Sequence, residues 1–111
     1  MKRLVPEKLL TIIADGALEA KLTKLAAKSG VSGYTVTEAR GAGSTGVQSG
    51  NLDIDTNILI KIILPESRVA GLLDELERLL KKSYKFKVFV SDVAVLMPQS
   101  YERPMDEDLR S

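Results

Sequence analysis

The segment from residue 54 to 64 restricts the fold most, because its apolar residues recur with period two. A large aliphatic residue occupies every even position except Thr56, whereas the odd positions alternate less cleanly between polar and apolar residues. This pattern is typical of a strand with one fully buried face. Pro65 follows and ends the strand, because proline cannot donate a hydrogen bond to the ladder. The chain must therefore build a sheet with one buried face and one mixed face.

The remaining patterns predict three more strands and two helices. The predicted strands cover residues 8–14, 33–39, 54–64 and 85–97, and the predicted helices cover residues 17–29 and the segment from Ser67 to Leu80. Gly30 is placed to stop the first helix, and Ser67 is placed as the N-cap of the second. The order β-α-β-β-α-β is that of the ferredoxin-like fold. We therefore expect an α+β sandwich, with a four-stranded antiparallel sheet and two helices on one face.

The second face of this sheet predicts self-association. Two helices cover only one face, and the other carries Leu59 and Ile63, with Phe89 expected among their neighbours. A small single domain rarely leaves that much apolar surface in water. Identical copies that cover this face would form a cyclic homo-oligomer.

Composition excludes several classes of site. The chain has 111 residues, which suits one domain, and it contains neither cysteine nor histidine. Metal sites with these ligands, thiol nucleophiles and histidine-based pairs are therefore excluded, and we expect no metal. The net charge of +1 gives no sign of nucleic-acid binding. No secretory segment or run of about 20 apolar residues is present, so we expect a cytoplasmic protein without membrane insertion.

The glycine-rich sequence Gly41-Ala42-Gly43-Ser44-Thr45-Gly46 matches G-x-G-x-x-G, the spelling of a dinucleotide-binding turn. A dinucleotide fold needs a helix at the third glycine, and none can begin in the polar residues that follow. A P-loop fails as well, because the Gly-Lys-Ser/Thr sequence is missing. The connection is nevertheless far longer than a normal hairpin of about two to five residues. Two interpretations remain open: a passive hairpin tip, and a loop whose first glycines approach a ligand at the strand exit.

Four local features follow one another along the chain: Gly30-Val31-Ser32-Gly33-Tyr34-Thr35-Val36, Gly41-Ala42-Gly43, Pro65 after the third strand, and Lys87-Val88-Phe89-Val90-Ser91. In this order they resemble the PII signalling proteins and their shorter PII-like relatives. The resemblance covers about residues 8–97. It implies a domain over residues 1–97 with a T-loop at about 41–53, and we expect a flexible tail over 98–111.

The resemblance also implies a homotrimer with adenine nucleotides in the clefts between subunits. Ile13 and Ile63 would pack against the adenine ring, while the Gly33-Tyr34-Thr35 segment would contact its polar edge. Backbone amides at the loop base would approach phosphate, and a lysine of the last strand would add charge. The implied nucleotide-binding residues are Ile13, Gly33, Tyr34, Thr35, Gly41, Ala42, Gly43, Ser44, Ile63, Lys85, Phe86 and Lys87.

Departures from the family pattern refine these implications. The long T-loop with a modifiable tyrosine is missing, and so are the two arginines expected after the last strand. Fewer cations mean fewer charge-assisted phosphate contacts, which favours AMP or ADP over ATP. The short loop is most similar to the bicarbonate- and carboxysome-associated branch. This branch implies a non-enzymatic regulator that acts on a transporter or enzyme through the T-loop, with bicarbonate as a possible second ligand.

Two alternatives from other classes stay open. A ligand-free structural trimer, as in the copper-tolerance CutA-type relatives, would have an inert loop. An acylphosphatase-like hydrolase would need an arginine beside an asparagine at a phosphate-sized loop, and Arg40 and Asn51 flank the glycine-rich segment. No general base is evident for this second alternative.

Overall fold

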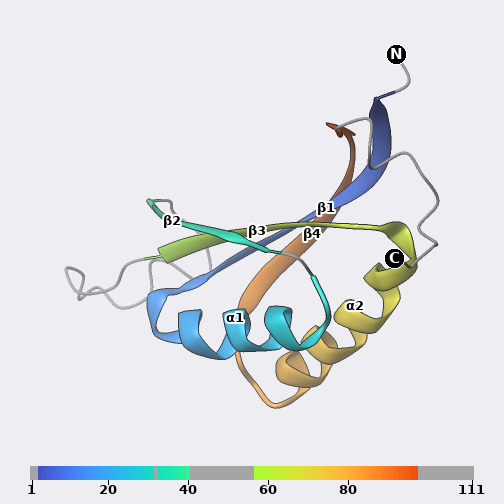
Figure 1. Cartoon of the computed structure of the whole chain (residues 1–111). Coiled ribbons are helices and arrows are strands. Elements are labelled where there is room, and N and C mark those ends of the chain that lie inside the picture. The colour runs from blue at the N-terminus through green and yellow to red at the C-terminus, as the bar shows by residue number, and fades with distance from the viewer. Residues whose placement is uncertain (1–2, 32, 41–56, 98–111) are drawn as a thin grey trace.

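Four strands form one antiparallel sheet, and two helices lie against one of its faces (Figure 1). The structure is a computed structural model that describes residues 3–31, 33–40 and 57–97. The elements are β1 (Leu4–Asp15), the short 3-10 helix η1 (Gly16–Leu18), α1 (Glu19–Lys28), β2 (Thr35–Ala39), β3 (Asn57–Leu64), α2 (Glu66–Lys81) and β4 (Phe86–Leu96). The strand order β2-β3-β1-β4 confirms the predicted ferredoxin-like α+β fold.

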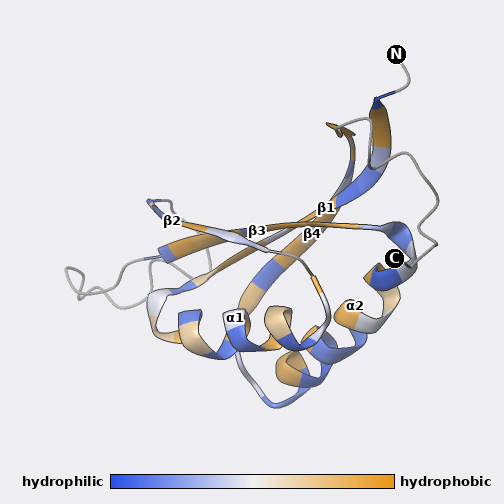
Figure 2. Cartoon of the chain, in the orientation of Figure 1, coloured by the Kyte–Doolittle hydropathy of each residue, from blue (hydrophilic) through white to orange (hydrophobic). Residues whose placement is uncertain are grey.

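The core lies between the helices and the even positions of the two central strands. Ile12 of β1 is the register partner of Ile60 of β3, and both are buried. Leu22 of α1 and Leu72 of α2 are buried in the same cluster. Figure 2 shows apolar residues concentrated along the strands and polar residues frequent on the helices. The period-two prediction for the third strand is therefore confirmed over residues 57–64.

Strand β1 begins four residues earlier than predicted, at Leu4 rather than Lys8. The β1–β4 ladder runs from Leu4 opposite Leu96, whereas the β1–β3 ladder starts only at Lys8. Pro6 therefore has a strand on one side only, where a missing amide is tolerated. Beyond the four-stranded part, β1 and β4 continue as a two-stranded ribbon.

The helix boundaries agree with one of the two predicted caps. Gly30 has φ +82° just after α1, which confirms it as the stop signal. Ser67 was the wrong N-cap, because α2 already begins at Glu66 with Pro65 in the cap position. The φ of Pro65, −69°, leads directly from strand into helix, and its carbonyl accepts a hydrogen bond from the Arg68 amide at 2.9 Å.

Ser67→Ala is accordingly expected to change the free energy of unfolding by less than about 0.5 kcal/mol, as for an ordinary exposed position. Loss of a true N-cap would cost about 1 kcal/mol. Urea unfolding of the two proteins at equal concentration distinguishes these values. A loss near the larger value would mean that Ser67 caps α2 in solution.

The described residues contain no helix that is long and apolar enough to cross a bilayer. Within the same residues, no group of three or more aspartates and glutamates is placed to hold a metal ion. The predicted T-loop at about 41–53 and the predicted tail at 98–111 both lie outside the described residues.

Candidate functional site

The face of the sheet that the helices leave open is built from the odd positions of β1 and β3. Three cross-strand rows run over it: Ile63–Leu9–Ser91, Lys61–Thr11–Phe89 and Leu59–Ile13–Lys87. Ile63 is 46% exposed and Phe89 is 49% exposed. The mixed second face predicted from the sequence is therefore confirmed, including Phe89 beside the central strands.

A cavity of about 730 Å³ opens on this face, where β3 ends and β2 has not yet begun. Its volume is in the range of small-molecule sites, about 300–1,000 Å³. The residues that line it are Glu7, Leu9, Gly33, Tyr34, Thr35, Lys61, Ile63, Pro65, Val95 and Met97. Two chain segments that are distant in sequence, residues 33–35 and 61–65, meet around it.

The cavity combines an apolar lining with a few polar groups. Leu9, Ile63 and Val95 supply aliphatic surface, and the Tyr34 side chain is exposed beside them. Glu7 and Lys61 bring opposite charges, and neither forms an ion pair with another residue of the described part. A flat, largely apolar ligand with polar edges suits such a lining.

Four of the predicted site residues, Gly33, Tyr34, Thr35 and Ile63, line this cavity. Ile13 lies on the same face but farther along β1. It pairs with Leu59, whereas Ile63 pairs with Leu9, four residues away. At about 3.3 Å per residue, Ile13 and Ile63 are roughly 13 Å apart. One chain alone therefore cannot wall a single adenine ring with both residues.

The predicted lysines lie on the first residues of β4 and just before it. Lys87 is the register partner of Ile13 and is exposed, and Lys85 is exposed as well. Phe86 is only 7% exposed and belongs to the core, so only its main chain could contact a ligand. Edge strands β2 and β4 are separated by three strand spacings, about 14 Å. Within one chain, Lys87 and the end of β2 are thus at opposite edges of the sheet.

The remaining predicted residues cannot be placed. Gly41, Ala42, Gly43 and Ser44 lie outside the described residues, as does Asn51, the partner that a hydrolase would need for Arg40.

Sequence reasoning missed six residues that line the cavity. Leu9 and Lys61 could have been found, because their odd positions place them on the face of Ile63. Pro65 could have been found too, since it follows Ile63 by two residues at the end of β3, whereas Glu7, Val95 and Met97 required the register of β1 with β4 and the early start of β1.

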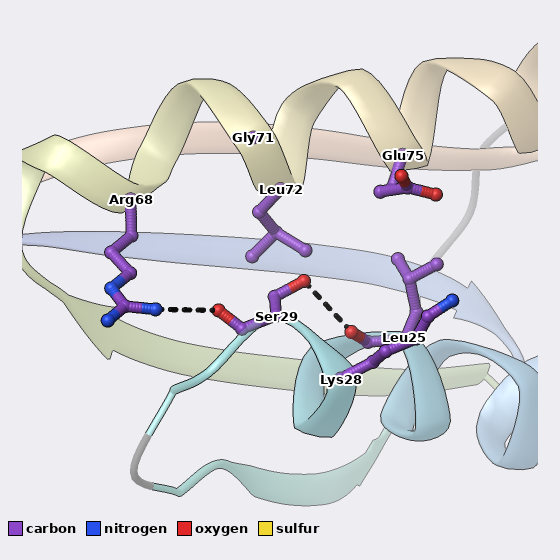
Figure 3. Close-up of a pocket in the computed structure, with 7 residues that line it drawn as sticks. All are labelled: Leu25, Lys28, Ser29, Arg68, Gly71, Leu72 and Glu75. Atoms are coloured by element: carbon purple, nitrogen blue, oxygen red, sulfur yellow. Dashed lines mark hydrogen bonds between the residues drawn. The ribbon is translucent and has the colours of Figure 1, made fainter.

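A second, smaller cavity of about 300 Å³ lies between α1 and α2, in the helix layer (Figure 3). Its lining residues are Leu25, Lys28, Ser29, Arg68, Gly71, Leu72 and Glu75. Arg68 Nη1 donates a hydrogen bond to the carbonyl oxygen of Ser29 at 3.3 Å. The sequence patterns had not singled out this position.

One ion pair joins β1 and β4 on the side of the sheet away from the first cavity. Lys8 Nζ donates to the Asp92 carboxylate, which is its register partner. This hydrogen bond is the largest cause that raises the pKa of Lys8 above its ordinary value. Lys8 therefore stays protonated at neutral pH, and the pair lies away from the cavity face.

Comparison with known proteins provides independent information on the family of this chain. The family model of nitrogen regulatory protein P-II matches residues 7–100. Among curated proteins, none matches the chain significantly. Among solved structures, a PII-like signalling protein from Thermus thermophilus is 35% identical, with a TM-score of 0.69 and coverage of 84% of this chain and 92% of that chain.

Structures of CPII from Thiomonas intermedia are similar as well. CPII bound to ADP and bicarbonate is 35% identical, with a TM-score of 0.74 and coverage of 88% of this chain and 96% of that chain. CPII bound to ADP, AMP and acetate is also 35% identical, with a TM-score of 0.72 and coverage of 86% and 93%. The resemblance noted from the local sequences is therefore confirmed.

Proposed function

Because the chain belongs to the P-II family, we propose that it is a regulatory protein that binds AMP or ADP between identical subunits. The observation that carries this proposal is the cavity on the open face, where Gly33, Tyr34, Thr35 and Ile63 meet. Its aliphatic wall suits the faces of an adenine ring, and the backbone groups of residues 33–35 suit its polar edge. The similar CPII structures contain ADP and AMP.

A second subunit is needed to complete such a site. Ile13 and Lys87 are neighbours on the face that holds the cavity, yet they lie too far from Ile63 to contact the same adenine ring. We propose a homotrimer in which the Ile13–Lys87 pair of one subunit faces the cavity of the next. This contact would also cover Ile63 and Phe89, whose exposure otherwise leaves apolar surface in water.

The phosphate end of the ligand would then lie near Lys87 and Lys85 of one subunit and the amides of Gly41, Gly43 and Ser44. An ammonium group and a series of backbone amides together suffice for a small anion. The two arginines expected after the last strand are missing from residues 96–100. Fewer charge-assisted contacts favour one or two phosphates over three.

We further propose that the segment at about 41–53 acts as the T-loop and contacts a target transporter or enzyme in the cytoplasm. Ordering a glycine-rich segment costs conformational entropy, so a ligand that fixes its base shifts the population of binding-competent loops. A role in inorganic-carbon metabolism is supported by the similar CPII protein, whose structure holds bicarbonate with ADP.

Calorimetric titration of the purified chain tests this function. AMP and ADP are expected to bind with one site per subunit, and ATP and cyclic AMP more weakly, while GMP serves as the control for the adenine edge. A second series with bicarbonate present is expected to change the heat of ADP binding. Absence of heat with all four adenine nucleotides would refute the proposal and favour a ligand-free structural trimer.

A further inference from the structure

We propose that Arg68 is a positioning residue for the nucleotide cavity, which it braces from the opposite side of the sheet. The proposal rests on the proposed function. It concerns the distance between the two walls of that cavity, which are residues 33–35 and residues 61–65. Arg68 does not line the cavity; it lies in the helix layer (Figure 3).

The sheet joins the two walls of the cavity at one end only, through the Thr35–Lys61 pair, and both of these residues line the cavity. The β2–β3 ladder begins at Thr35 opposite Lys61 and runs away from the cavity to Ala39. Gly33 and Tyr34 on one wall, and Ile63 and Pro65 on the other, lie beyond that first pair. These outer residues have no ladder pair of their own, so a contact outside the sheet can add to the fixing of their separation.

Each of these two walls is linked along the chain to one of the helices, Pro65 directly to α2 and Gly33 to α1 through the few residues after Lys28. Pro65 is followed by α2, and its carbonyl accepts the Arg68 amide at 2.9 Å, so Arg68 is one turn from that wall. Gly33 follows the end of α1, where Ser29 is the C-cap residue. A contact between Arg68 and Ser29 therefore links the two chain segments that lead to the walls.

The Arg68 guanidinium makes that connection. Its Nη1 donates to the Ser29 carbonyl oxygen at 3.3 Å (Figure 3). Ser29 lies at the C-terminus of α1, where the free carbonyls attract a cation. The interaction is exposed to solvent, so it is of modest strength and its removal should leave the core intact.

The position of the Arg68 side chain requires a residue without a Cβ at position 30, and this residue is Gly30. A Cβ at Gly30 would lie 2.3 Å from Nη1 and 3.3 Å from Cζ of Arg68, and the φ of +82° already favours glycine. Any other residue at position 30 would push the guanidinium away from Ser29. The Gly30 backbone and the Arg68 side chain therefore depend on each other.

Titration of ADP into variants of the full chain tests the brace. Arg68→Ala is expected to raise the Kd for ADP about three- to tenfold, the range typical of residues that act through a neighbour. Arg68→Lys should recover part of the lost ADP affinity, because lysine keeps the positive charge but lacks the planar guanidinium group. Arg78→Ala is the matched control: Arg78 is exposed on the same helix, with Glu75 3.7 Å away, and should leave the Kd unchanged.

A double-mutant cycle with Gly30→Ala separates positioning from simple destabilisation. If both changes break the same contact, the combined rise in Kd is smaller than the product of the two single rises. The proposal is overturned if Arg68→Ala binds ADP with the wild-type Kd, even if its unfolding midpoint falls. Absence of ADP binding to the wild type would instead refute the proposed function, and the brace with it.

Discussion

Phe89→Asp is expected to convert the assembled protein into monomers and to abolish binding of ADP. Phe89 is 49% exposed on the open face, in the row that also contains Thr11 and Lys61. A carboxylate at this position would have to lose its water when a second subunit covers the face, which costs several kcal/mol without a partner. Light scattering after size exclusion measures the mass, and calorimetry measures the loss of ADP binding.

The matched control for this variant is Leu80→Asp. Leu80 is 43% exposed, close to the value for Phe89, but it lies on α2, in the helix layer away from the open face. The control should keep the wild-type mass and the wild-type affinity for ADP. If Phe89→Asp also stays assembled and binds ADP normally, the open face is not the subunit contact, and the proposed composite site fails.

Residue parity is what made the fold predictable from the sequence, whereas only four of the ten residues that line the cavity were predicted. In residues 57–64 the side chains alternate between faces, so the burial of Ile60 and the exposure of Ile63 follow from the same pattern. The family resemblance, rather than a local pattern, predicts Gly33 and Thr35 at one site with Ile63, and all three line the cavity in the structure. Parity by itself accounts for Ile63 alone, which lies on the mixed face of one clear strand.

Residues whose placement depends on long-range pairing could not be predicted in this way. Alternation predicts that Phe86 and Lys87 face opposite sides of the sheet, but it does not predict which of them faces the core. The pairing of Phe86 with the buried Ala14 places Phe86 on the core side. Val95 reaches the cavity only because β1 and β4 stay paired to Leu4. The separation of Ile13 from Ile63 is likewise a matter of register, and it is the reason that we propose a site shared by two subunits.

Ile60→Ala is expected to lower the free energy of unfolding by about 2–5 kcal/mol, the usual cost of emptying a well-packed core position. Ile60 is fully buried and is paired with Ile12 on one side and Val36 on the other. Urea unfolding at a fixed protein concentration measures the loss, since association contributes equally to variants that remain assembled.

Leu73→Ala on α2 removes the same number of carbon atoms from an exposed position, and should cost about 0.5 kcal/mol or less. The comparison tests the parity on which the candidate site depends. If Ile60 were on the open face, Lys61 and Ile63 would face the helices instead, and the cavity that they line would lie on the helix side of the sheet. Equal stabilities of the two variants would therefore contradict the assignment of Ile60 to the core and, with it, the candidate site. A large difference would show that the even positions of β3 face the helices, so that the odd positions are free to contact a nucleotide and a second subunit.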